Sequence, residues 1–425
     1  MSNIIKDCRI LKKYETSLRR QSMDVKCYEL KIQENKLSNT QLDKLYSFFK
    51  QAKYLTNDII SSNDVYKYDY KTKNVNVKWF KDDVEHNEIK ELILPSQIKQ
   101  DIQARIMTDI SNLSKKKKKG FKNGKLKFRK EVNTIGLKQY NTTWKFGEKN
   151  KFYVAGIGWF KVNGKTQIPS DITEWGNAKL VKKSTGFFVQ VTGFKNKNIT
   201  ESDIIIEPKD IVGLDFGIKD CITLSNGEKY NFSFNTKQVE KAQRKVSHKK
   251  KGSKNRNKCI QKLKKQHQKV VNRKNDASNK FVSSLKNKYK LICIQDENLK
   301  AWHSGLFGKQ VQHSILGRIK SKLIKLNTTQ VVDRFAPTTQ VCPNCGSKNK
   351  LKLSDRIYNC DCGFVEDRDI KSAQCVVLFA LNNYICTERT NFKPVEILTS
   401  NSIEKYLLLF NKIKLESLKR EATTL

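Results

Sequence analysis

The sequence has few acidic residues and no long apolar run. Its 425 residues include 84 Lys+Arg but only 42 Asp+Glu, and the resulting formal charge of +42 is spread along the chain. Such a chain is expected to bind a long polyanion, because each neutralised phosphate releases a counterion. No apolar run approaches the roughly 18 residues of a membrane span, and residues 1–6 lack the start of an h-region. We therefore expect neither membrane insertion nor secretion.

Histidine is also scarce. The five His residues, at positions 86, 248, 267, 303 and 313, are scattered, and no paired-His motif with a catalytic Tyr accompanies them. This argues against a classical DNA-strand transposase. We interpret His267, which lies on the apolar stripe of a predicted helix, as a packing residue.

The apolar pattern predicts a multidomain α+β protein. An apolar fraction of 37% with 21 Phe and 14 Tyr is sufficient for packed cores, and the length predicts about two to four domains. Alternation at 25–32 and in short segments between 132 and 200 predicts strands of a small β-barrel. A helix with an apolar stripe is predicted after residue 38, with Ser38 and Thr40 as N-cap candidates, and a second follows Pro95, separated from the first by a loop at 61–78.

Four of the 11 cysteines have metal-ligand spacing. Cys342 and Cys345 form a CxxC motif, and Cys360 and Cys362 form a CxC motif, one residue shorter than a usual zinc ribbon. Four thiolates predict a closed structural Zn²⁺ site. A disulfide pair and a degenerate, weakly binding site are the alternatives. The other cysteines are scattered, as expected in a reducing compartment.

Two basic segments are candidates for nucleic-acid contact. The first follows the second predicted helix and interleaves aromatics with lysines. The second, 236–290, is predicted to be a helical pair and has 20 Lys+Arg against only Glu240 and Asp276. The candidate residues are Lys115, Lys116, Lys117, Lys118, Lys119, Phe121, Arg129, Arg244, Lys249, Lys250, Lys254, Arg256, Lys264 and Lys265.

Three acidic sites are candidates for a shared cation site. Asp215 ends an apolar run that predicts a buried strand, and Glu297 follows a second such run. Alternation along this strand places Glu297 on the face of Gln295 and Asp296 on the other, so Glu297 is the only carboxylate on the Gln295 face. Asp367 and Asp369 precede a predicted helix, where either carboxylate could be only an N-cap. Three such carboxylates could hold two hard divalent cations for phosphodiester chemistry.

In order, these motifs resemble those of the TnpB family, transposon-encoded RNA-guided nucleases related to compact type V CRISPR effectors. The resemblance covers nearly the whole chain. The segments that carry it are Gly213–Ile218, Gln295–Lys300, the two cysteine pairs, Asp367–Asp369, and also 94–98, 251–256 and 388–396.

The resemblance implies a ribonuclease-H-like (RuvC) α/β nuclease domain with a zinc-finger insertion, preceded by a wedge β-barrel that carries a helical recognition insert. It implies an RNA-guided DNA endonuclease with Asp215, Glu297 and Asp369 as its catalytic residues, two catalytic Mg²⁺ and one structural Zn²⁺. The implied partners are a locus-encoded guide RNA, double-stranded target DNA with a short flanking motif, and the displaced single strand. A monomer or homodimer in the prokaryotic cytoplasm, at the nucleoid, is expected. The implied boundaries are 1–32 and 132–208 for the barrel, 33–131 for the insert, 209–335 for the nuclease domain with its hairpin 236–290, 336–366 for the finger, and 367–425 for the final segment and tail.

Two residues depart from the family pattern. Many members have glutamate where this chain has Gln295, and asparagine where it has Lys371. The nearest carboxylate on the predicted strand face is then Glu297, and Lys371 could dampen a metal site. These departures support an alternative function, an RNA-guided DNA-binding protein that represses or targets without cleavage.

Overall fold

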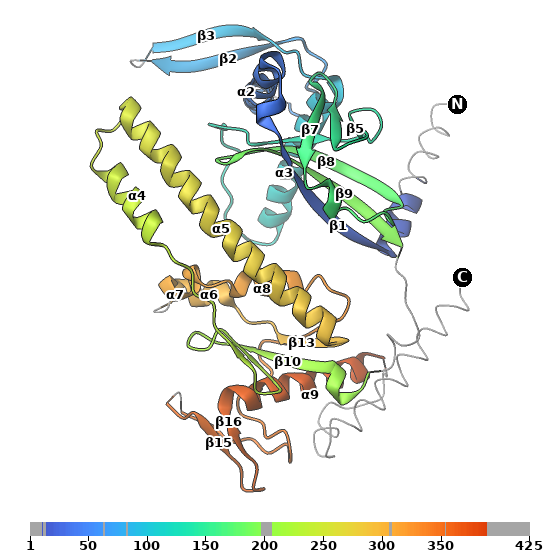
Figure 1. Ribbon diagram of the computed structural model, residues 1–425, viewed down its shortest axis with the longest axis vertical. Coiled ribbons are helices and arrows are strands. Elements are labelled where there is room, and N and C mark those ends of the chain that lie inside the picture. The colour runs from blue at the N-terminus through green and yellow to red at the C-terminus, as the bar shows by residue number, and fades with distance from the viewer. Residues whose placement is uncertain are drawn as a thin grey trace. The chain divides into compact units, whose positions relative to one another are not determined.

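The computed structural model describes residues 11, 14–62, 64–81, 84–196, 206–305, 308–352 and 354–388. The chain divides into two compact units with the boundary at residue 198 (Figure 1). Residues 197–205, the family-like segment 389–396 and the tail to 425 lie outside the described residues. None of the described helices is long and apolar enough to cross a membrane.

The first unit is built on a seven-stranded antiparallel sheet. Hydrogen bonds join the strands in the order β4-β8-β9-β1-β7-β6-β5. All seven lie where alternation predicts strands. Within the described residues no ladder joins the end strands β4 and β5, so backbone hydrogen bonds do not by themselves close the expected barrel. The bounds are β1 Met23–Ile32, β4 Thr134–Leu137, β5 Trp144–Phe146, β6 Lys151–Val154, β7 Gly158–Asn163, β8 Glu174–Lys183 and β9 Gly186–Asn196.

Two long helices, α2 (Asn39–Ser61) and α3 (Ser96–Lys118), bury their apolar stripes in the core of this unit. Of the two N-cap candidates for α2, Ser38 is confirmed, and Thr40 lies inside the helix. The Ser38 hydroxyl accepts from the backbone N–H of Gln41, whose side chain accepts from the Ser38 N–H. This capping box fixes the start of the helix.

Between the helices lies a β-hairpin, β2 (Asn74–Lys81) and β3 (Val84–Glu91). The predicted loop at 61–78 was wrong from residue 74 on, because β2 begins there. The insert that was expected to be helical therefore also contains a β-hairpin. Val75 is buried against the core. Interspersed Asn and Lys residues gave β2 a polar composition that concealed its alternation.

The second unit contains a five-stranded mixed sheet with helices on both faces (Figure 1). β10, β13 and β14 are parallel, and β11 and β12 extend the sheet antiparallel beyond β10. α9 covers one face, while α5 and α8 cover the other, so β10 and β13 are buried as their apolar runs predict. The bounds are β10 Ile211–Phe216, β11 Ile222–Leu224, β12 Lys229–Tyr230, β13 Leu291–Gln295, β14 Thr329–Val332, α8 Leu316–Leu323 and α9 Arg368–Glu388.

The predicted helical pair is α4 (Lys237–Ser247) and α5 (Lys254–Lys288). Residues of α5 are buried only from Lys274 onward, so its N-terminal half is not part of the core. His267 is exposed, and its interpretation as a packing residue was wrong. The position is apolar-periodic, but α4 alone covers too little of this half to bury it.

The remaining elements are short. β15 and β16 form the two-stranded sheet beside the cysteine cluster, with Tyr358 fully buried against it. The bounds are α6 Leu299–Ser304, α7 Gly308–His313, β15 Ile357–Asn359, β16 Val365–Asp367 and the 3₁₀ turns Glu34–Lys36, Lys165–Gln167 and Pro208–Asp210.

Candidate active site and metal centre

Asp215 is the penultimate residue of β10, where the strand meets the start of α9. Gly213 allows this approach, because a Cβ there would collide with the carbonyl oxygen of Ala373 in α9. The Ser372 hydroxyl, one residue earlier in α9, donates to Asp215 Oδ1 over 3.1 Å. Burial, and then the neighbouring Asp369 carboxylate, raise the pKa of Asp215 to about 7. Asp215 thus sits where a positive charge would be stabilised.

Asp369 lies in the first turn of α9, and Asp367 provides the cap. Asp367 Oδ1 accepts from the backbone N–H of Asp369 at 2.9 Å and of Ile370 at 3.3 Å. Of the two capping candidates, Asp367 therefore performs the structural role. It is also ion-paired with Lys229 at 2.8 Å.

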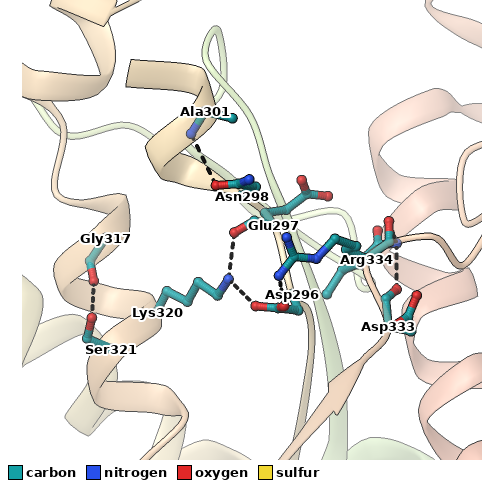
Figure 2. Close-up of polar contacts among 10 residues, drawn as sticks. Asp296, Glu297, Asn298, Ala301, Gly317, Lys320, Ser321, Asp333 and Arg334 are labelled. Carbon is teal, nitrogen blue, oxygen red and sulfur yellow. Dashed lines mark hydrogen bonds and ion pairs between the residues drawn. The ribbon is translucent and has the colours of Figure 1, made fainter. Parts of the chain in front are cut away.

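Glu297 follows the end of β13 in a tight turn. Its N–H donates to the carbonyl of Gln295, and its own carbonyl accepts from Lys320 Nζ at 2.6 Å. Lys320 and Arg334 also ion-pair with Asp296 and lower its pKa. Figure 2 shows the Glu297 carboxylate turned away from this cluster. Because β13 ends at Gln295, the turn and not strand alternation sets the direction of Glu297, so the premise that Gln295 and Glu297 alternate along one strand was wrong.

Gln295 is 5% exposed and fully engaged. Its Nε2 donates to the carbonyls of Asp333, Arg334 and Ala336 at 2.9–3.2 Å. Its Oε1 accepts from the Thr338 hydroxyl. Because Leu214 pairs with Ile294, Gln295 is the next parallel neighbour of Asp215. The neutral amide therefore occupies the position beside Asp215 and anchors the loop after β14.

The three carboxylates are electrostatically linked through Asp215, since both Asp369 and Glu297 raise its pKa. They do not form a closed ligand cluster. Among the described residues, only one group of three or more His, Cys, Asp or Glu residues has all its ligand atoms within 4.8 Å of one another, and it consists of the four cysteines of the CxxC and CxC motifs. A cation here would depend on side-chain rotation or on ligands from a substrate.

Lys371 does not point at the carboxylates. Its fully buried Nζ donates to the carbonyls of Thr338 and Val341 and lies 4.2 Å from the centroid of the Tyr358 ring. Lys371 therefore ties α9 to the start of the cysteine cluster. Among the described residues no hydrogen bond or ion pair joins Lys371 to a carboxylate. Burial lowers the pKa of Lys371 and the Asp215 charge opposes that shift, so the expected influence of Lys371 on a metal site stays a prediction.

The four predicted zinc ligands come together. Cys342 Sγ lies 3.7 Å from Cys362 Sγ, and Cys345 Sγ lies 3.5 Å from Cys360 Sγ. Four sulfurs about 2.3 Å from one tetrahedral ion would lie about 3.8 Å apart, so the group fits Zn²⁺. The backbone N–H of Cys362 lowers the pKa of Cys360 to about 6, which favours a thiolate. Gly346 and Gly363 follow the pairs at φ 76° and 87°, so the short CxC turn still presents both sulfurs.

The basic candidates are distributed over both units. Lys115 to Lys118 form the last turn of α3, with Lys119 as C-cap, and in the second unit the candidates lie on α4, α5 and the turn between them. All are exposed except Arg256, which is half-buried. Arg129 ion-pairs with Asp109, which reduces its availability to a phosphate.

Sequence reasoning missed the residues that orient the site. Ser372, Thr338 and Lys320 carry no motif of their own. The signal for Ser372 was its position, one helical turn after Asp369 on the face that meets β10. A cavity of about 490 Å³, walled by the β10–β11 turn, the segment entering α4, and α7–α8, lies beside the turn that follows Asp215.

Comparison with known proteins gives consistent matches. Residues 203–302 match the family model OrfB_IS605, probable transposase, and residues 314–376 match the Cas12f1-like TNB domain. A putative RNA-guided DNA endonuclease of Streptomyces pristinaespiralis is 31% identical over 186 residues, 41% of this chain and 46% of that protein. The TnpB-like protein L770 of Acanthamoeba polyphaga mimivirus is 24% identical over 274 residues, 56% of this chain and 51% of that protein.

The chain thus spans about half the length of the curated relatives it matches. A chain in the cryo-EM structure of the Cas12f1-sgRNA-target DNA complex aligns with TM-score 0.47 and 13% identity, over 84% of this chain and 99% of that chain. The two family models and the TnpB-like relatives together identify the chain as a member of the TnpB family.

Proposed function

We propose that the protein is an RNA-guided DNA endonuclease. It would cleave phosphodiester bonds where the C-terminal end of β10 meets the start of α9 in the second unit. The observation that carries the proposal is that Asp215, at the end of β10, lies against the first turn of α9, which carries Asp369 and whose Ser372 hydroxyl donates to Asp215. Burial, Asp369 and Glu297 also raise the pKa of Asp215. Buried carboxylates whose pKa values are raised by neighbouring carboxylates are typical of functional sites. RNA-guided nuclease activity in general is supported by the relative named a putative RNA-guided DNA endonuclease.

Asp215 and Asp369 would hold the divalent cations, with Glu297 reaching the site from the turn after β13. When bound, Mg²⁺ would activate the attacking water and stabilise the leaving oxygen. Ser372 orients the Asp215 carboxylate, and the Asp367 cap fixes the turn that carries Asp369. The four cysteines would hold one structural Zn²⁺ beside α9, away from the reaction.

A guide RNA and target DNA are the proposed partners. Pairing between RNA and DNA would supply most of the sequence selection, with the protein reading a short flanking motif. The exposed lysines of α3, α4 and α5 would contact phosphates.

The test is a plasmid-cleavage assay with locus RNA and Mg²⁺. Asp215→Ala should abolish cleavage and leave RNA binding intact, and Asp276→Ala, an exposed carboxylate on α5 paired with Lys280, is the matched control. EDTA should abolish cleavage by the unmodified protein. Cleavage that survives Asp215→Ala would refute the assignment.

A second function, RNA-guided DNA binding without cleavage, is favoured by Gln295. Its neutral amide fills the position next to Asp215 and is engaged by four partners. Tight, RNA-dependent binding of target DNA without Mg²⁺-dependent cleavage would establish this alternative.

A further inference from the structure

A cluster of three cations lies between α5 and α8, apart from the proposed catalytic carboxylates. Lys274 comes from α5, and Arg318 and Lys322 come from α8. Lys274 is only 8% exposed, while the other two are partly exposed. The cluster therefore has a buried cation at its base and two accessible cations at its rim.

Among the described residues, the hydrogen-bond partners of these cations are all neutral groups. Arg318 donates to Asn275 Oδ1 at 2.6 Å, and Lys322 donates to oxygens of Asn275, Ser278 and Asn279. Lys274 donates to the Gln312 carbonyl over 3.4 Å, which is long for such a bond. Its Nζ lies 5.6 Å from the centroid of the Phe234 ring.

No carboxylate balances the cluster within the described part of the chain, where none of the three cations forms an ion pair within 4.0 Å. Burial and the charge of Arg318 lower the pKa of both Lys274 and Lys322. The nearest acid along α5, Asp276, is exposed and paired with Lys280. Buried charges are normally paired, because an isolated one is costly to desolvate. An anionic ligand would supply the missing charge.

We propose that Lys274, Arg318 and Lys322 form a binding site for one backbone phosphate of a nucleic acid. Arg318 has N–H groups beyond the one it gives to Asn275, and its planar fork suits two phosphate oxygens. Lys322 is held in place by three oxygens and contributes a fixed charge. Lys274 lies behind and attracts the anion to the base of the cluster. The choice of a nucleic-acid phosphate rests on the proposed function.

The first test uses inorganic phosphate and the intact chain, without added magnesium. Thermal unfolding is followed in phosphate and in chloride at equal ionic strength. The wild type should show a higher Tm in phosphate. Lys274→Met should unfold at a higher temperature than wild type in chloride and lose the phosphate-specific increase, because it removes the uncompensated charge. Lys280→Met on the same helix is the control and should retain the increase. An equal phosphate effect in wild type and Lys274→Met would overturn the site.

The second test measures binding of a single-stranded DNA and an RNA of the same sequence against salt concentration. Arg318→Gln should weaken binding by about tenfold. It should also reduce the slope of log K against log salt by about 0.7, the value for one phosphate contact on a single strand. An effect on only one of the two polymers identifies the source of the phosphate, and no effect on either overturns the proposal. Because neither test involves cleavage, failure of the site is distinguishable from failure of the nuclease assignment.

Discussion

The Gln295 amide lies beside Asp215 and anchors the loop after β14. Replacing Gln295 by glutamate tests how much stability the protein loses when a second carboxylate takes this position. The Gln295 side chain donates two N–H groups to three carbonyls and accepts from Thr338. A net contribution of about 1 kcal/mol per hydrogen bond predicts that Gln295→Met lowers the free energy of unfolding by about 2–3 kcal/mol. This variant is the control, because it loses the amide without adding charge.

Gln295→Glu should cost more, because it buries a second carboxylate next to Asp215. If its pKa rises by about 3 units, as that of Asp215 does, the additional cost at pH 8 is about 4 kcal/mol. A carboxyl with a raised folded-state pKa destabilises increasingly as pH rises above its unfolded value of about 4.3. The two variants should therefore converge in stability near pH 4 and diverge toward pH 8.

Chemical denaturation at both pH values, with and without Mg²⁺, measures the effect. If a cation binds at Asp215, Mg²⁺ should stabilise both variants, because both keep Asp215 and Asp369, and it should stabilise the Glu variant more, because the added carboxylate is a further ligand. Equal unfolding free energies for the two variants at pH 8 would show that an ionised carboxylate at position 295 carries no extra free-energy cost, and would refute this reasoning.

Three further predictions concern single positions. Cys360→Ser should reduce bound zinc from one ion per chain to less than one by elemental analysis; undiminished zinc would contradict the four-sulfur site. Gly213→Ala should lower the Tm of the intact chain, because its Cβ collides with the Ala373 carbonyl, and an unchanged Tm would mean that α9 can move away at no cost. Ser38→Ala should cost about 1 kcal/mol by denaturation, because it removes the hydroxyl that accepts from the Gln41 N–H in the capping box, whereas Ser38→Gly should cost only a few tenths.

The sequence was sufficient to locate an element or a site wherever its signal lies within one element or one turn. Alternation located the strands of the seven-stranded sheet, apolar runs located β10 and β13, the Ser38 cap located the start of α2, and the cysteine spacing located four sulfurs that the structure brings together. Each of these depends on the period of one element or on a turn of a few residues. The β2–β3 hairpin was missed because its polar residues hide a pattern that only packing against α2 and α3 makes stable.

The sequence by itself determined which residues are acidic, basic or thiol-bearing, and in which elements they lie. Only the tertiary structure decided that Gln295 rather than a carboxylate neighbours Asp215, and that Lys371 faces the cysteine cluster. These two side-chain roles depend on partners more than 30 residues away in the chain, such as Thr338 and Asp333. A one-dimensional pattern cannot specify such pairs, because they are set by how β10, β13 and α9 pack together.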